Sequence, residues 1–92
     1  METKKVFAVL MDITISHNFE QDEFDCDIAG LYTSRKKAWD KIMEMVSKDK
    51  EEGEVLHSYG FKSLGTWTVK YKDNKGGTRK INYTIYDDMT IE

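Results

Sequence analysis

The segment Lys5-Val-Phe-Ala-Val-Leu-Met-Asp-Ile-Thr-Ile-Ser16 alternates with a period of two residues. Successive side chains of a strand point to opposite faces, so the odd-numbered side chains from Phe7 to Ile15 form one apolar stripe. The even-numbered side chains of the first half are apolar as well, which is typical of a strand with neighbours on both sides. The segment therefore predicts a strand over about residues 4–16 in the interior of a sheet.

A second strand is predicted where three apolar residues alternate with acidic ones, at Phe24, Cys26 and Ile28. The simplest pairing is antiparallel to the first strand, with these side chains toward the core and the carboxylates outward. The step from Ala29 to Gly30 is typical of a bulge.

The C-terminal half carries the same alternation in two segments joined by the turn-rich stretch Asp73-Asn-Lys-Gly-Gly77: first Trp67, Val69 and Tyr71, then Ile81, Tyr83 and Ile85. The last segment is predicted to run to about Tyr86 or on to the C-terminus. Val55 to Phe61 also alternates, but glycines interrupt the pattern. The sequence of this segment fits either a kinked strand or a loop.

One helix is predicted between these strands, starting after an N-cap at Thr33 or Ser34, continuing to about Lys50 and ending at a left-handed Gly53. Its apolar residues fall within one arc of the helix: Ala38, Trp39, Ile42, Met43, Met45 and Val46. The chain length fits one domain, residues 1–92. The predicted fold is α+β, β-β-α-β-β, an antiparallel sheet of about four strands with one amphipathic helix packed on one face.

Composition narrows the class of protein. The net charge of −3 argues against a general nucleic-acid binder, because such domains need a basic face. The single Cys26 allows no internal disulfide and fits a reducing compartment. The longest apolar run is too short to cross a bilayer. We therefore expect a soluble, cytoplasmic protein without membrane contact.

Three residues invite a search for a catalytic set, because strand parity places His17, His57 and Cys26 on one apolar face. A nucleophile and its base need a mutual geometry that no spacing here fixes. A small enzyme or small-molecule binder that uses these residues is therefore an alternative hypothesis. No metal or phosphate-binding motif is present, so the sequence predicts no catalytic residue, metal or cofactor.

The acidic segment is the predicted partner-binding site, with five carboxylates within eight residues: Glu20, Asp22, Glu23, Asp25 and Asp27. Such a row can present negative charge to a basic groove on another protein, where complementary potential speeds association. The competing interpretation is that cations just downstream neutralise it within the molecule: Arg35, Lys36, Lys37 and Lys41.

Three of these cations, Arg35, Lys36 and Lys37, stand in the first turn of the helix, where they oppose the positive end of the helix dipole and call for compensation. Either the acidic segment lies over the helix start, which we favour, or an external anion binds there.

The C-terminal half is rich in aromatic residues with cations between them, and a sheet face that carries both can stack single-stranded bases. The aromatic residues are Trp67, Tyr71, Tyr83, Tyr86 and Tyr59. Trp67, Tyr71 and Tyr83 share a face with buried positions, so they are predicted beneath the helix, and the lysines between them face outward. We therefore expect no direct nucleic-acid binding.

The element Gly30-Leu-Tyr-Thr-Ser-Arg-Lys-Lys-Ala-Trp39 resembles a strand-to-helix element of small uncharacterised bacterial and phage α+β proteins. Some phage inhibitors of host defence, including anti-CRISPR proteins, are similar in size and acidity. The resemblance implies a non-catalytic inhibitor of a host protein that handles nucleic acid. A homodimer is a third hypothesis, through Val6, Ala8 and Leu10 if these are uncovered in the monomer.

Overall fold

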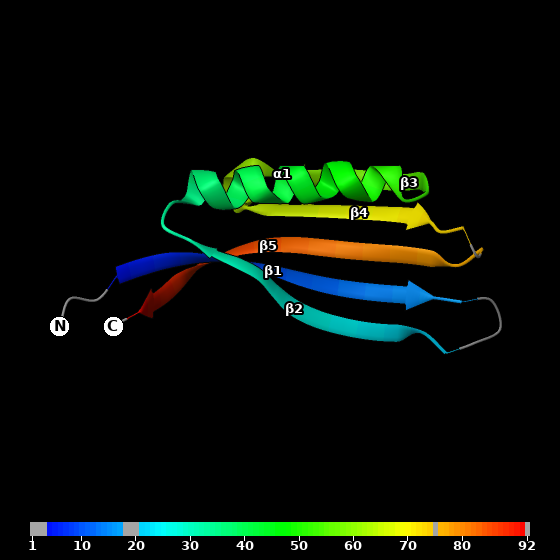
Figure 1. The fold of residues 1–92 in the computed structure, drawn as a ribbon, viewed down its shortest axis with the longest axis horizontal. Helices are drawn as coiled ribbons and strands as arrows, with labels where there is room; N and C mark the ends of the chain where they lie inside the picture. Colours follow the sequence, from blue (N-terminus) through cyan, green and yellow to red (C-terminus); the bar gives the residue numbers. More distant parts are fainter. Residues whose placement is uncertain (1–3, 18–20, 75, 92) are drawn as a thin grey trace.

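The computed structural model describes residues 4–17, 21–74 and 76–91 of the chain (Figure 1). Its elements are β1 (Lys4–Ser16), β2 (Glu23–Tyr32), α1 (Arg35–Glu51), β3 (Glu54–Phe61), the 3-10 turn η1 (Lys62–Leu64), β4 (Thr66–Lys72) and β5 (Thr78–Ile91). They form one antiparallel sheet and one helix in the predicted order, β-β-α-β-β, with one more strand after the helix than that order contains. The α+β class is therefore confirmed.

The sheet has five strands in the order β2-β1-β5-β4-β3, one more than predicted. The additional strand is β3, the segment for which a strand and a loop were both open. The strand needs a glycine at position 60 because the ring of Trp67 packs against its backbone. A Cβ at Gly60 would come 2.6 Å from Trp67 Cε3. As predicted, β1 has a neighbour on each side, β2 and β5.

The helix begins as expected at Ser34, whose hydroxyl accepts a hydrogen bond from the backbone N–H of Lys37 at 3.2 Å. Its end differs from the prediction. Glu52 is the C-cap, and the described glycines with positive φ are Gly65 and Gly76. Close packing explains the glycine at position 53 instead, since a Cβ there would clash with the carbonyl oxygen of Lys72. Within the described chain, no helix has both the length and the apolar character needed to cross a bilayer.

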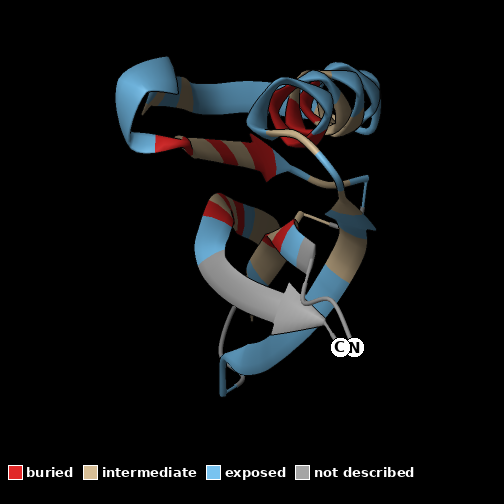
Figure 2. Ribbon diagram, turned by 90° about the vertical axis from the view of Figure 1, so that its left-hand side faces the viewer, coloured by how far each residue is buried: buried red, intermediate tan, exposed pale blue. Residues whose placement is uncertain are grey.

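The core lies between α1 and one face of the sheet, where Figure 2 shows buried residues on the inner side of the helix and on the strands. Its buried members come from α1 and from three strands: Val9, Ala38, Trp39, Ile42, Val46, Val69, Tyr71, Ile81, Tyr83 and Ile85. The predicted stripe of β1 and the predicted arc of the helix are thus confirmed as one interior. We call the opposite side of the sheet the open face.

The predicted orientation of β2 is wrong. Asp25 and Asp27 are the register partners of Ile13 and Met11, which pack against the core. Partners in an antiparallel pair point to the same face, so these carboxylates lie on the helix side of the sheet. The open face receives the residues that were expected in the core: Phe24, Cys26 and Ile28.

A β-bulge explains this inversion. Val9 pairs with Gly30 but Leu10 pairs with Ile28, which leaves Ala29 as the extra residue and confirms the predicted bulge. One extra residue inverts the alternation beyond it. Tyr32, Asp25 and Asp27 therefore all point to the helix side of the sheet, although Tyr32 has an even residue number and the two aspartates have odd ones.

The dimer surface suggested by the start of β1 is largely covered within the monomer. Val6 is 6% exposed, Ala8 is 0% exposed, and Leu10 is half-buried. The homodimer hypothesis required these three side chains to be uncovered in the monomer, and the structure does not show that exposure.

Candidate functional site

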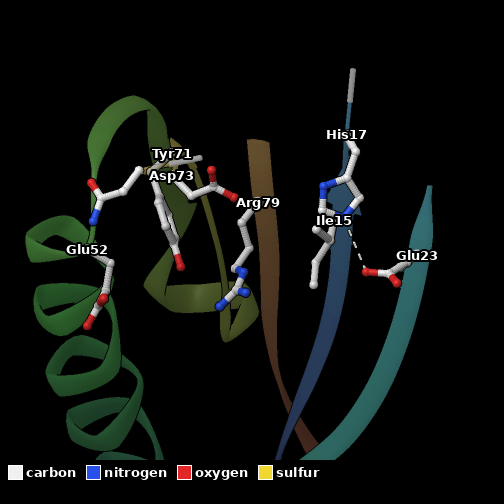
Figure 3. Close-up of a pocket in the computed structure, with 8 residues that line it drawn as sticks. Ile15, His17, Glu23, Glu52, Tyr71, Asp73 and Arg79 are labelled. Carbon is white, nitrogen blue, oxygen red and sulfur yellow. Dashed lines mark hydrogen bonds and ion pairs between the residues drawn. The ribbon is translucent and has the colours of Figure 1, made fainter. Parts of the chain in front are cut away.

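A row of four side chains crosses the helix side of the sheet where β1 ends. Glu23 on β2 pairs with Ile15 on β1, Ile15 pairs with Arg79 on β5, and Arg79 pairs with Tyr71 on β4. The row lines one side of a pocket of about 300 Å³ (Figure 3). The remaining lining residues come from the adjoining chain ends and turns: His17, Glu52, Asp73 and Asn74.

Local structure fixes the carboxylates around this pocket. The Asp73 turn closes on itself, because Asp73 Oδ1 accepts a hydrogen bond from the Gly77 N–H at 3.0 Å and the Asp73 N–H donates to the Gly77 carbonyl at 2.9 Å. Glu52 is placed by the end of α1, where helix carbonyls add partial negative charge. Figure 3 shows Glu52 and Glu23 on opposite sides of Arg79.

His17 faces one of these carboxylates. Its Nε2 lies 3.3 Å from Glu23 Oε2, and the two side chains are 32% and 69% exposed. A pair this exposed contributes at most about 1 kcal/mol. The contact therefore orients Glu23 more than it stabilises the fold.

Arg79 is the cation of the pocket, and its Nε is buried without a hydrogen-bond partner among the described residues. A buried N–H without an acceptor costs about 1 to 3 kcal/mol. The neighbouring Tyr71 is buried, which raises the pKa of its phenol, while the Arg79 charge acts in the opposite direction. The pocket therefore places one cation, Arg79, among several carboxylates.

A second polar contact secures the helix end behind the pocket. The Tyr83 hydroxyl donates a hydrogen bond to Asp49 Oδ2. Partial burial raises the pKa of Asp49, and the Tyr83 hydrogen bond opposes that change. Burial and the adjacent carboxylate raise the pKa of Tyr83. Tyr83 is therefore a neutral hydrogen-bond donor, and Asp49 is the acceptor that this hydrogen bond holds in place.

The predicted site residues lie along β2 and the turn before it. Asp22, Glu23, Asp25 and Asp27 are exposed, and Glu20 lies outside the described residues. Since β2 is an edge strand, its outer N–H groups need acceptors. Asp25 Oδ1 accepts from the next backbone N–H, that of Cys26, and Asp27 Oδ1 from that of Ile28, both at 2.8 Å. These two carboxylates therefore also cap the free edge.

The cations at the helix start do not neutralise this acidic row among the described residues. Arg35 donates to the Ser63 carbonyl at 2.9 Å, Lys36 pairs with Asp40, and the partner of Lys41 is Glu44. The preferred explanation for the basic first turn, an acidic segment lying over the helix start, is wrong. β2 runs from the acidic row toward the helix, and even Asp27 is five strand residues, about 17 Å, from the end of β2 at Tyr32.

The alternative catalytic residues are not brought together. Cys26 and His57 lie on β2 and β3, the two opposite edges of the sheet, and His17 follows the end of β1. Cys26 is exposed rather than buried as expected, and its hydrogen bond to Asp12 and the Asp12 charge raise the pKa of the thiol. A raised pKa disfavours the nucleophilic thiolate. No cluster suited to a metal ion occurs in the described chain.

Sequence reasoning missed the residues that join the acidic row to the pocket: Glu52, Asp73 and Arg79. The signal for Arg79 was the hairpin at Asp73–Gly77, which aligns Arg79 with Tyr71. We call the exposed carboxylates of β2 and its turn, together with the two across the pocket, the acidic edge: Asp22, Glu23, Asp25, Asp27, Glu52 and Asp73.

No protein-family model matches the sequence, and no curated protein or solved structure matches the chain. The geometry of the site therefore carries the functional argument.

Proposed function

We propose that this protein is a non-catalytic binding module that docks on a basic surface of a larger protein through the acidic edge. One observation carries the proposal: the exposed carboxylates of β2 form no ion pair with a lysine or arginine among the described residues. Exposed charges of one sign that lack a lysine or arginine counterion within the molecule favour association with a surface of the opposite sign.

The spacing of the carboxylates supports a groove as the partner surface. Glu23, Asp25 and Asp27 are alternate residues of one strand, so they follow each other at about 6.5 to 7 Å on one face. A row of this kind resembles the charge row of a nucleic-acid strand. A groove that binds nucleic acid through lysines and arginines would therefore complement it.

The pocket supports recognition of a particular side chain. A lysine or arginine of the partner that enters between Glu23 and Glu52 meets two carboxylates near the negative end of α1. Arg79 lies between these two carboxylates, and its Nε is buried. The partner cation therefore binds at the carboxylate oxygens and not at Arg79 Nε.

In this proposal the protein acts by occupying a surface that its partner needs. The resemblance of the segment from Gly30 to Trp39 to phage proteins supports an inhibitor of a host protein that handles nucleic acid, of the kind carried by phages and mobile elements. A cytoplasmic site of action follows from such a partner.

The test uses an arginine-rich peptide as a probe of basic surfaces, titrated by calorimetry at low and at physiological salt. One variant carries Asp22→Asn, Glu23→Gln, Asp25→Asn and Asp27→Asn, which removes four charges but retains oxygen acceptors for the edge N–H groups. The matched control removes four other exposed carboxylates: Asp40→Asn, Glu44→Gln, Glu51→Gln and Glu54→Gln.

We expect the first variant to bind the peptide about eightfold to thirtyfold more weakly than the unmodified protein, as the loss of four charge contacts of about 0.3 to 0.5 kcal/mol each implies. The control should retain most of the affinity. Equal weakening in both variants would show that net charge alone attracts the peptide, and the proposal would be wrong.

A further inference from the structure

Two exposed aromatic side chains lie next to each other on the open face. Tyr59 and Phe61 on β3 are 56% and 60% exposed. Their register partners are Thr68 and Thr66, whereas Gly60 between them pairs with Trp67 on the helix side. Alternate residues of a strand are about 6.5 to 7 Å apart on one face. The two rings therefore form a short platform that the helix does not cover.

A row of nitrogen-bearing side chains borders this platform. His57 on β3 pairs with Lys70 on β4, and Lys70 pairs with Lys80 on β5. Like charges directly opposite each other across strands destabilise a sheet. The ion pairs found among the described residues involve neither lysine, so folding alone does not account for the Lys70–Lys80 pair.

The remaining charges of this face are few. Lys72 follows Lys70 on the same side, and acidic groups are placed there at Asp12 and Glu54. Small polar residues fill the space between lysines and rings, with Thr68 Oγ1 donating to Asn82 Oδ1 at 2.6 Å. The acidic carboxylates of β2 point to the other side of the sheet. This half of the open face is therefore cationic and aromatic within a protein whose net charge is −3.

We propose that the β3-β4-β5 half of the open face binds single-stranded nucleic acid, with unpaired bases stacked on Tyr59 and Phe61 and phosphates placed over Lys70 and Lys80. Stacking on exposed rings beside a cationic groove is how proteins hold single strands without a sequence preference. Paired bases in a duplex do not present their faces to such a platform. The charge of the lysine pair complements the polyanion.

The sequence-based expectation rested on the parity of Trp67, Tyr71 and Tyr83, and the structure places all three on the helix side. Tyr59 belonged to the same aromatic set. Its place beside Phe61 on the open face follows from the pairing of β3 with β4, which the sequence left open. The new surface also lies on the other face from the acidic edge, so either proposal stands without the other.

The test measures fluorescence anisotropy of a short labelled oligothymidylate against increasing protein, at several salt concentrations. The variants are Tyr59→Ala, Phe61→Leu and Lys70→Glu. Lys37→Glu is the matched control, because it makes the same charge change at an exposed position of α1. Circular dichroism verifies that each variant is folded, and light scattering reports the oligomeric state.

We expect binding to the single strand and much weaker binding to a duplex of the same length. Tyr59→Ala should weaken binding at least about fivefold, the lower end of the range for one stacked base. Lys70→Glu should reduce the slope of log affinity against log salt by about 0.7, the value for one phosphate contact on a single strand. Lys37→Glu should leave that slope unchanged.

The proposal is overturned if the oligothymidylate does not bind at low salt, or if Lys37→Glu weakens binding as much as Lys70→Glu. It is also overturned if the unmodified protein is a dimer that Phe61→Leu converts to a monomer, since the platform then binds a second copy. Neutralising the acidic edge should not weaken binding of the oligonucleotide, which keeps the two proposals distinguishable.

Discussion

Tyr83 on β5 donates its phenolic hydrogen bond to the carboxylate of Asp49 in the last turn of α1, and this contact fastens the helix to the sheet beside the pocket. Tyr83 is 2% exposed, so water cannot readily replace its partner. The position of Glu52, three residues further on, depends on this attachment. The stability of the fold and the shape of the pocket are therefore linked at one hydrogen bond.

Tyr83→Phe should lower the free energy of unfolding by about 1 to 2 kcal/mol, because the half-buried Asp49 carboxylate loses its donor. Urea denaturation measures this change. Tyr86→Phe is the control at an exposed position of the same strand, and it should alter stability by less than about 0.5 kcal/mol. Equal stability of the two variants would show that the Tyr83 hydrogen bond does not anchor the helix.

Asp49 should give stability a defined pH dependence. Burial raises the pKa of its carboxyl above the ordinary value of 3.8, so the folded protein holds this proton to higher pH than the unfolded chain does. The free energy of unfolding therefore falls as pH rises from the ordinary to the raised pKa, and the contribution is constant above that window. Asp49→Asn should remove this fall.

Denaturation of both proteins across acidic pH measures the effect as a difference in unfolding free energy, unmodified minus variant. The difference should decrease with rising pH and then level off. An increase with pH would mean that the fold stabilises the charged carboxylate, contrary to the burial that we infer for Asp49.

Gly60→Ala should destabilise the sheet by about 1 to 3 kcal/mol, because a Cβ there would clash with the Thr66 carbonyl oxygen and lie 2.6 Å from the Trp67 ring. The near-ultraviolet circular dichroism of Trp67 should change with it. Thr33→Ala, at an exposed position before the helix, is the control. An unchanged melting temperature for Gly60→Ala would contradict the close packing of Trp67 on β3.

Much of the fold follows from periodicity. The stripe of β1, the cap at Ser34 and the inner arc of α1 are local patterns whose consequences are local, and the structure confirms them. Alternation does not say which face of a strand is covered, and the extra residue at Ala29 inverted the faces of β2. The error at β2 therefore comes from a register shift that depends on a neighbouring strand.

The pocket is harder to predict from the sequence than the strands and the helix, for a related reason. Glu23, Arg79 and Tyr71 meet only because three strand pairings align them in one row. Each pairing follows from a hairpin or a crossover that residue types alone do not specify. The acidic segment itself was visible in the sequence because its density of carboxylates is a local property.

The most direct test of the acidic edge maps where a basic ligand binds. Amide chemical shifts of the isotopically labelled protein are followed by nuclear magnetic resonance while the arginine-rich peptide is added. The account predicts that the largest shifts cluster from Asp22 to Asp27 and at Glu52 and Arg79, with little change at Tyr59 and Phe61. Shifts spread evenly over all exposed carboxylates, including Asp40 and Glu44, would contradict it.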